Sequence, residues 1–245
     1  MLINCDAKGL EIVCAAFLSK DKVLYKELLN GIDTHGENQK RFNLPSRLIA
    51  KTFVFRLIYG GSAYSYANDP DFAEVKGNES FWQGVIDEFY NKYTGVKAWH
   101  DEIYRTATQD GRLCMPTGRI HNFESTLRRG TLEWPRTKIL NYPVQGLGAD
   151  IMSLIRVSFH KRFKAANISG EEISTIHDSI VVDVMNKELQ RTVELFYEVF
   201  NDLPVNFKRV FGVEFDLPLL CEISYGMNKL DLTEHKKGSI IAIED

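Results

Sequence analysis

Two cations and two aromatic residues recur every four positions in residues 47–59: Arg47, Lys51, Phe55 and Tyr59. On a helix of 3.6 residues per turn, each four-residue step rotates by only about 40°, so these side chains share one face. Arg and Lys are rarely buried without a partner. Such a face suits a nucleotide, whose phosphates need cations and whose sugar and base need apolar contacts. An ordinary amphipathic helix with a solvated charged edge has the same pattern, and the spacing alone leaves both interpretations open.

Two aspartates lie at the ends of predicted β-strands. Asp6 follows an apolar N-terminal run, and Asp178 lies 172 residues later, between two β-branched runs. Two-metal phosphoryl transfer needs carboxylates from separate strands, which hold two Mg²⁺ ions about 3.5–4 Å apart. An aspartate at a strand end is also an ordinary turn or capping residue. Either aspartate alone is therefore compatible with both roles.

The elements that must position these residues are predicted from periodicity and turn signals. A short strand ends near Asp6, and a helix follows with one apolar face formed by Leu10, Val13, Cys14 and Phe17. Residues 20–60 and 80–110 are predicted to be helical, and a further helix is predicted to begin near Pro143. These segments form a helical insertion between two strand-bearing ends.

The predicted strands lie mostly in the second half of the chain. Residues 114–125 indicate a strand pair or turn region, and residues 171–186 a hairpin with His177, Asp178 and Ser179 at its bend. Residues 215–232 contain another strand, and residues 233–245 are expected to be polar and loosely held. The predicted fold class is α+β, with a strand-bearing platform built from both ends of the chain.

Composition limits the function classes. With 245 residues and 44% hydrophobic residues, the chain can bury the core of one large domain or two subdomains. The net charge of −3 gives no overall basic signature for nucleic acid, so a nucleic-acid contact would depend on local basic faces. Two such clusters are present, each of which a solvated surface would also explain. They are Arg128, Arg129, Arg136 and Lys138, and Lys40, Arg41, Arg47, Lys51 and Arg56.

The spacing of the cysteines and the length of the apolar runs indicate the cellular compartment of the protein. Cys5, Cys14, Cys114 and Cys221 are scattered without a CxxC pair, which indicates core thiols in a reducing environment. No signal peptide is recognisable, and no apolar run reaches the ~18 residues of a membrane span. We therefore expect a cytoplasmic protein, in the host cell if the source is viral, with no membrane partner.

Three segments resemble motifs A, B and C of the DNA polymerase I family, family A, and occur in the same order. They are DAKGLE (residues 6–11), RLIAKTFVFRLIYG (residues 47–60) and IHDS (residues 176–179). The stretches DTHGENQ, TGR and NYPVQGLGADI also match. The twelve-residue gap from His35 to Arg47 resembles the compact bacteriophage replicative branch. The resemblance covers nearly the whole chain, to about Leu232.

The resemblance implies a right-hand polymerase palm, an antiparallel sheet with flanking helices, into which helical fingers are inserted. Residues 1–19 and 125–245 would form the palm, and residues 20–124 the fingers. The chain begins five residues before motif A. In this family the proofreading exonuclease and the thumb precede that point, so both are expected to be absent. We expect a fragment, or the C-terminal piece of a split polymerase that pairs with an exonuclease/thumb subunit.

The resemblance also implies a role for each motif residue. Asp6 and Asp178 would bind two Mg²⁺ ions, or Mn²⁺ as a substitute, with the Ala7 carbonyl completing one shell. Arg47 and Lys51 would bind the dNTP phosphates, and Lys51 would protonate the pyrophosphate. The remaining contacts to nucleotide and primer–template DNA would come from His35 (triphosphate), Phe55 (sugar), Tyr59 (templating base), His177 (primer terminus), Asn141 and Gln145 (minor groove), and Arg136 (primer backbone).

The sequence supports some of these implied roles less strongly than others. Asn141 and Gln145 could instead serve as a turn residue and a helix cap. The spacing from Arg136 to Asn141 is one residue longer than the family pattern. Four positions depart from that pattern: Lys8, Val13, Arg56 and Ser179. Ser179 replaces a common glutamate, so a degenerate palm that acts as a scaffold is an alternative.

Glu11 bears on the choice between DNA and RNA synthesis. In the family this glutamate fills the space that a ribose 2′-OH would occupy, and it thereby excludes ribonucleotides. Single-subunit RNA polymerases share the R-x₃-K-x₇-Y-G framework and the HDS triplet. They lack the glutamate, however, and usually carry Met where this chain has Phe55. The sequence therefore predicts template-directed DNA synthesis, with an RNA polymerase-like palm and fingers as the alternative.

Overall fold

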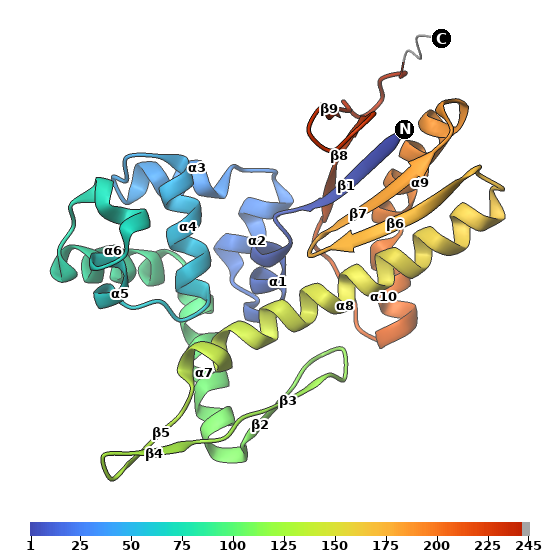
Figure 1. Cartoon of the computed structure of the whole chain (residues 1–245). Helices are drawn as coiled ribbons and strands as arrows, with labels where there is room; N and C mark the ends of the chain where they lie inside the picture. Colours follow the sequence, from blue (N-terminus) through green and yellow to red (C-terminus); the bar gives the residue numbers. More distant parts are fainter. Residues whose placement is uncertain (242–245) are drawn as a thin grey trace. The chain divides into compact units, whose positions relative to one another are not determined.

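The protein is described by a computed structural model in which residues 1–241 are placed (Figure 1). It divides into two compact units: unit 1 comprises Met1–Leu10 and the described residues from Gly148 onward, and unit 2 comprises Glu11–Leu147. These divisions fall at other positions than the palm and fingers boundaries expected after residues 19 and 124. The assignment of palm and fingers to these segments stays a prediction.

Unit 1 is built on one antiparallel sheet with the strand order β6-β7-β1-β8-β9. Its strands are β1 (Leu2–Lys8), β6 (Gly170–Ile176), β7 (Ser179–Val184), β8 (Leu220–Gly226) and β9 (Thr233–Glu234). The chain's first strand therefore lies at the centre, between two strands from the last third of the sequence. In β1, Ile3, Cys5 and Ala7 are buried and alternate with half-buried residues, as expected for a central strand with one face against a core.

Helices cover this sheet through apolar faces. Unit 1 contains the 3₁₀ turn η2 (Asn186–Glu188), α9 (Leu189–Asn201), α10 (Leu203–Phe211) and the second part of α8 (Arg136–Ala165). The apolar face of α9 packs against β1 and β8. Phe159 of α8 stacks on Phe196 of α9, with ring centroids 3.9 Å apart and planes 8° from parallel. The core of unit 1 therefore lies between the sheet and these helices.

The C-terminal segment corrects one prediction. Residues 233–245 were expected to be loosely held, yet β9 pairs with β8 and His235 is only 6% exposed. The hydroxyl of Tyr197 lies 3.0 Å from Nδ1 of His235. The prediction is wrong for this part because β8 offers an open edge, and β9 satisfies backbone groups of that edge. Residues 242–245 lie outside the described residues.

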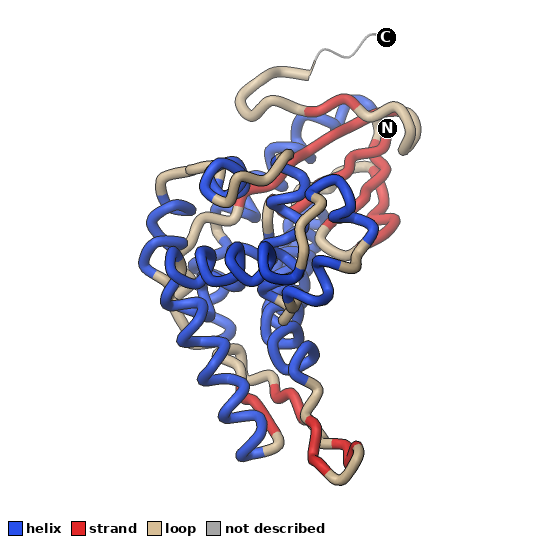
Figure 2. Tube along the Cα trace, turned by 90° about the vertical axis from the view of Figure 1, so that its left-hand side faces the viewer, coloured by secondary structure: helices blue, strands red, loops and turns tan. Residues whose placement is uncertain are grey.

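Unit 2 is mainly helical, as the tube coloured by secondary structure shows (Figure 2). Its elements are α1 (Leu10–Ser19), α2 (Lys22–Leu29), α3 (Thr34–Arg41), α4 (Arg47–Ile58), α5 (Ala63–Ala67), the 3₁₀ helix η1 (Pro70–Val75), α6 (Glu79–Lys92), α7 (Thr94–Asp110), the hairpins β2–β3 (Arg112–Cys114 and Ile120–Asn122) and β4–β5 (Thr126–Arg128 and Thr131–Glu133), and the first turns of α8. The predicted helical segments and the strand pair near residue 120 are confirmed.

An aromatic cluster fixes one face of α4. Phe53 is fully buried and contacts the rings of Phe42, Tyr66, Trp82 and Phe89, with centroids 5.1–6.2 Å apart. Several buried aromatic rings around one side chain bury a large apolar area and restrict rotation of the helix about its axis. The opposite face of α4, which carries Arg47 and Lys51, is exposed.

Helix α8 begins earlier than the sequence predicts. We expected a start near Pro143, but the helix begins at Arg136 and Pro143 lies inside it. Proline removes one helical hydrogen bond and usually ends a helix. Here Ile139 is buried with Ala107, Leu113 and Phe123, and this packing holds the turn before the proline. Tertiary contacts therefore override the local signal.

The cysteines differ in their surroundings. Cys5 and Cys14 are buried and Cys221 is half-buried, whereas Cys114 is exposed, and none of the four forms a disulfide. The expectation of four core thiols is therefore wrong for Cys114, which lies at the end of β2 in the pattern exposed–buried–exposed. Within residues 1–241, no helix combines the length and the apolar character that a membrane crossing requires.

Candidate active site

The two predicted metal-binding aspartates come together in unit 1. Asp6 lies on β1, and Asp178 lies in the turn between β6 and β7. The β1–β7 ladder pairs Asp6 with Ser179, and the backbone N–H of Ala7 donates to the carbonyl oxygen of Asp178 at 2.9 Å. Both aspartates are half-buried. Strand pairing thus places carboxylates that are 172 residues apart on neighbouring backbones.

The turn that carries Asp178 has a distinctive backbone. Ile176 pairs with Ser179, so His177 and Asp178 form a two-residue turn. His177 has a φ of 53°, in the left-handed region that non-glycine residues rarely adopt. A two-residue hairpin turn requires such a φ at its first central position. Ser179 Oγ donates to the carbonyl oxygen of Ile176 at 3.0 Å and closes the turn. His177 is exposed at its tip.

The donor set at this turn fits magnesium. Mg²⁺ in nucleotide-dependent sites is usually held by one or two carboxylates, with substrate phosphates and water as further ligands. Asp6 and Asp178 supply two carboxylates, and the backbone carbonyl of Ala7, the next residue on β1, is a candidate for a third oxygen. Within residues 1–241, no cluster of three or more His, Cys, Asp or Glu side chains could bind a metal by itself. Any metal ion at this turn would therefore need further oxygen ligands besides side chains, such as a backbone carbonyl, substrate phosphates or water.

In unit 2, the predicted cationic and aromatic face is present on α4. Ser46 caps the helix, because its hydroxyl accepts from the N–H of Ile49 at 3.2 Å. The side chains of Arg47 and Lys51 are exposed, and those of Phe55 and Tyr59 are half-buried. Lys51 Nζ lies 5.5 Å from the centroid of the Phe55 ring, within range of a cation–π contact. The face therefore changes from charged to aromatic along the helix.

Asp33, for which the sequence predicted no role of its own, pairs with Arg47. Arg47 donates from Nε to Asp33 Oδ2 at 2.8 Å and from Nη2 to Oδ1 at 2.8 Å, a bidentate pair. The hydrogen bond from Arg47 lowers the pKa of Asp33 to about 2. Asp33 also occupies the position before α3, the helix that carries His35. Its place at the start of the DTHGENQ stretch, two residues before His35, is the sequence signal that could have identified it.

His35 lies against the same face. Its ring meets Phe55 edge to face at a centroid distance of 5.3 Å. Burial, together with the nearby cations Arg47 and Lys51, lowers the pKa of His35 to about 4, whereas Asp33 opposes this shift. The imidazole is therefore neutral at pH 7. Its buried Nδ1 has no hydrogen-bond partner within residues 1–241.

Three further predicted residues meet at the end of α4. Burial and the nearby carboxylate of Glu11 raise the pKa of Tyr59, whereas a side-chain hydrogen bond with Gln145 opposes this. Glu11 comes from α1 and Gln145 from α8, so this contact joins three helices of unit 2. Gly60, directly after Tyr59, adopts a φ of 87° and lets the chain leave the helix there.

The two remaining predicted residues lie on α8. The buried Oδ1 of Asn141 has no hydrogen-bond partner within the described part of the chain. An acceptor in that state costs free energy unless a ligand or water satisfies it. The guanidinium of Arg136 lies 4.8 Å from the centroid of the Tyr104 ring, a contact that orders this side chain at the helix start. Both residues remain predicted DNA contacts.

The geometry thus comprises two groups of residues. One is the carboxylate pair with His177 in unit 1. The other, in unit 2, brings together side chains from α1, α3, α4 and α8: Glu11, Asp33, His35, Arg47, Lys51, Phe55, Tyr59 and Gln145. Chemically, the first group offers oxygen ligands for a divalent cation. The second group offers cations beside aromatic rings.

Comparison with known proteins identifies the family. A model of DNA polymerase family A matches residues 1–231, which include every motif residue discussed above. This chain belongs to DNA polymerase family A. The match covers the two aspartates of unit 1 and the α4 face of unit 2 alike.

Relatives and solved structures agree with this membership. DNA polymerase I of Caldicellulosiruptor bescii is 24% identical over 239 residues, which cover 93% of this chain and 26% of that protein. DNA polymerase I of Pseudomonas aeruginosa is 26% identical over 243 residues, which cover 93% of this chain and 24% of that protein. The chain therefore spans about a quarter of the length of these relatives.

The fold is also that of a polymerase domain. The structure of the POL domain of Pol1 from M. smegmatis, in complex with DNA primer–template and dNTP, aligns with a TM-score of 0.74. It is 21% identical and covers 92% of this chain, which in turn covers 39% of that chain. The α+β fold class predicted from the sequence is confirmed.

Proposed function

We propose that this chain is the catalytic palm and fingers portion of a template-directed DNA polymerase, which transfers a nucleotide from dNTP to a primer 3′-OH. The observation that carries the proposal is the hydrogen bond between Ala7 and Asp178, which joins the two strands that bear the aspartates. Membership of family A supports DNA over RNA synthesis. Because the chain spans about a quarter of its relatives, a partner that supplies exonuclease and thumb, and an origin in the bacteriophage branch, remain predictions.

The reaction forms a bond between the primer 3′ oxygen and the α-phosphorus of the dNTP, and it breaks the bond to the β-phosphate. The hydroxyl proton leaves to solvent, and pyrophosphate is the leaving group. Two Mg²⁺ ions bound by Asp6 and Asp178 would stabilise the charge on the attacking and leaving oxygens. The Ala7 carbonyl fits as an additional oxygen ligand. Primer–template DNA and dNTP are the substrates.

In this proposal, the side chains of α4 and α3 bind the incoming nucleotide. Arg47 and Lys51 bind the β- and γ-phosphates, and Lys51 Nζ donates a proton to the departing pyrophosphate. The neutral imidazole of His35 donates a hydrogen bond to the triphosphate. This hydrogen bond does not require a positive charge on His35. Phe55 packs on the sugar, and Tyr59 lies beside the templating base. Clustering of these side chains around α4 supports the assignment.

Other residues contact the primer–template. Asn141 and Gln145 donate from their amide groups to minor-groove acceptors, which every Watson–Crick pair offers. His177 lies near the primer terminus, and Arg136 contacts the primer backbone. Glu11 excludes the ribose 2′-OH, and its proximity to Tyr59 supports a position beside the incoming sugar.

Primer extension with matched dNTP and rNTP substrates tests the proposal. The full chain is assayed in enzyme excess with Mg²⁺, so that weak DNA binding does not mask the chemistry. We expect incorporation of dNTP, and for Glu11→Ala a rise of about tenfold or more in the relative use of rNTP, because a steric and polar mismatch is removed. Glu102→Ala, an exposed carboxylate on α7, is the matched control.

Two results would contradict the proposal. Unchanged sugar selectivity in Glu11→Ala would favour the RNA polymerase-like alternative. No Mg²⁺-dependent incorporation, even with an exonuclease and thumb portion supplied, would favour the scaffold alternative. Loss of selectivity in the Glu102→Ala control would show that the effect is not specific to Glu11.

A further inference from the structure

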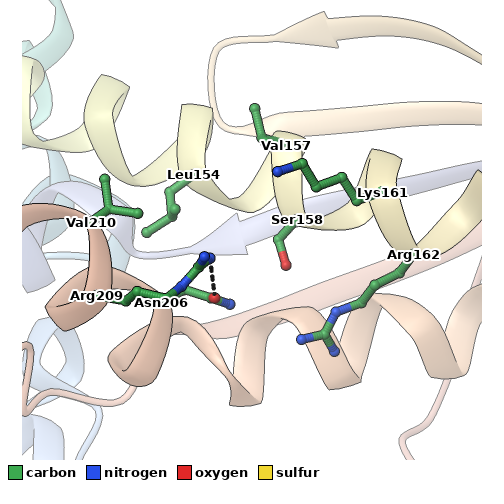
Figure 3. Close-up of a pocket in the computed structure, with 8 residues that line it drawn as sticks. All are labelled: Leu154, Val157, Ser158, Lys161, Arg162, Asn206, Arg209 and Val210. Carbon is green, nitrogen blue, oxygen red and sulfur yellow. Dashed lines mark hydrogen bonds between the residues drawn. The ribbon is translucent and has the colours of Figure 1, made fainter.

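A groove in unit 1 lies between α8 and α10, outside the residues assigned to catalysis (Figure 3). Its volume is about 300 Å³, and five residues from α8 and three from α10 line it. They are Leu154, Val157, Ser158, Lys161, Arg162, Asn206, Arg209 and Val210. On α8 the lining positions 154, 157, 158 and 161 follow helical spacing, so the groove extends along about two turns, roughly 10 Å.

The groove wall is largely apolar and accessible. Val157 is 47% exposed and Val210 is 52% exposed. Leu203 and Phe207, in contrast, are buried. On α10, Leu203 and Phe207 therefore belong to the core of unit 1, whereas Val210 lines the groove.

The rim of the groove is positively charged. Lys161, Arg162 and Arg209 line it, and no carboxylate does. Arg162 is neutralised by Asp202 at 2.6 Å. Arg209 donates to the amide oxygen of Asn206 at 3.0 Å, and within residues 1–241 neither Arg209 nor Lys161 forms an ion pair. A chain with a net charge of −3 thus presents two cations without counter-ions beside exposed valines.

We propose that this groove binds an acidic, amphipathic helical segment of a partner protein. Apolar side chains at i, i+3 or i+4 would contact Val157, Val210 and Leu154, as in other helix-in-groove complexes. Asp or Glu side chains flanking them would pair with Lys161 and Arg209. Duplex DNA matches the groove less well, because a phosphate backbone has no apolar side chains to cover the valines. The inference does not depend on the polymerase activity.

Binding of a defined peptide to the full chain tests this inference. The probe is a fluorescein-labelled helical peptide of about 14 residues, with Leu on one face and Glu on both flanks, measured by fluorescence anisotropy. We expect saturable binding that weakens with salt. An isomer with the same composition and its leucines distributed around the helix is expected to bind at least about tenfold more weakly, about 1.4 kcal/mol.

Charge reversal identifies the surface. The double variant Lys161→Glu/Arg209→Glu is expected to raise Kd of the Leu/Glu peptide at least about tenfold. Lys164→Glu, which reverses one charge on α8 outside the groove lining, is the control and is expected to change Kd by less than about twofold. Val210→Ser, which shortens an exposed apolar side chain, should weaken binding without affecting the fold measured by circular dichroism.

Several outcomes would overturn the inference. These are no saturable binding of the Leu/Glu peptide, equal binding of the isomer, or an equal loss in Lys164→Glu. A loss of primer–template affinity in the double variant, with peptide binding unchanged, would identify a DNA contact instead. Binding of the double variant to anionic lipid vesicles is not expected to differ from wild type; a selective loss there would indicate a membrane surface and overturn the peptide proposal.

Discussion

Asp6 and Asp178 in unit 1 are distant in the chain and become neighbours only because β1 pairs with β7, whereas Arg47, Lys51 and Phe55 in unit 2 share a face because they lie on one helix. The carboxylate pair therefore depends on a long-range ladder. The α4 face depends on local spacing, and its fine geometry depends on neighbours such as Asp33 and His35. We therefore expect substitution of an aspartate at the sheet to abolish nucleotide incorporation, and substitution of a residue beside α4 to alter substrate binding.

The largest effect is expected at the sheet. Asp178→Asn should reduce single-nucleotide incorporation by roughly 10³-fold or more, because loss of a carboxylate ligand removes more charge stabilisation than loss of one neutral donor, which costs 10²–10³. Rates are measured on primer–template with the enzyme in excess. Asp183→Asn is the control, since Asp183 lies on the same β7 strand and pairs with the N-terminus. Retention of more than about a tenth of the rate in Asp178→Asn would contradict a metal-binding role.

A smaller and different effect is expected beside α4. Asp33→Asn should raise the KM for dNTP about fivefold and leave kcat within about twofold, because an exposed pair contributes up to about 1 kcal/mol and here it orients Arg47. Steady-state kinetics with varied dNTP measure this. Asp33→Glu, which keeps the negative charge, should raise the KM for dNTP less than Asp33→Asn does.

The matched control for Asp33 lies on α3, the helix that follows Asp33. Glu37 pairs with Lys40 at 3.0 Å on the surface of α3, and Glu37→Gln should leave KM unchanged. A lower KM in Asp33→Asn would mean that Asp33 competes with the triphosphate for Arg47 instead of orienting it. An equal rise in the KM for dNTP in Glu37→Gln would assign the effect to the charge of α3 as a whole.

Acidification should destabilise unit 2 more than unit 1. Burial lowers the pKa of His100 and that of His35 to about 4, and both lie in unit 2. The unfolded chain therefore binds more protons between about pH 6.5 and 4, so the free energy of unfolding should fall there, by at most about 1.4 kcal/mol per pH unit for each histidine. Asp33, with a pKa of about 2, contributes only below about pH 3.8.

Urea unfolding at pH 7 and pH 4.5, combined with hydrogen exchange, measures this difference. We expect exchange in unit 2 to rise first on acidification, and His100→Gln to flatten the pH dependence. His160→Gln, a change at an exposed histidine of unit 1, is the control. Equal acid sensitivity of both units, with no change in His100→Gln, would refute the assignment to buried histidines.

The smallest effect is expected on the side of α4 away from the nucleotide face. Arg56 pairs with Asp69 and Asp71 and lies 5.2 Å from the ring centroid of Phe72. Arg56→Ala should lower the free energy of unfolding by about 1 kcal/mol and leave the KM for dNTP unchanged, since these contacts hold η1 to α4. Thermal unfolding and steady-state kinetics separate the two effects. A raised KM with unchanged stability would place Arg56 in the substrate site.

The features that depend on neighbouring residues were predictable. The helical character of residues 47–58 and their cationic and aromatic face follow from i, i+4 spacing. The bend at His177 and Asp178 follows from two β-branched runs around a polar pair. Family membership, carried by motifs in the right order, was recognisable in the same way.

Other features depend on contacts between distant segments. The pairing of Asp33 with Arg47, the early start of α8 before Pro143 and the addition of β9 to the sheet each override or complete a local signal. The exposure of Cys114 is another example, because burial of a thiol depends on the surrounding fold. The α8–α10 groove likewise exists only where two helices meet.

By itself, the sequence determined the candidates for the chemistry: the two aspartates, the α4 face and Glu11. The α4 face follows from residue type and from the short-range periodicity of a helix, whereas Glu11 is a candidate through the resemblance to the family. The tertiary structure decided that β1 pairs with β7 beside Asp178, and that Asp33, His35 and Gln145 surround α4. Such contacts arise when distant segments bury apolar surface together and satisfy each other's hydrogen bonds, and no local spacing encodes them.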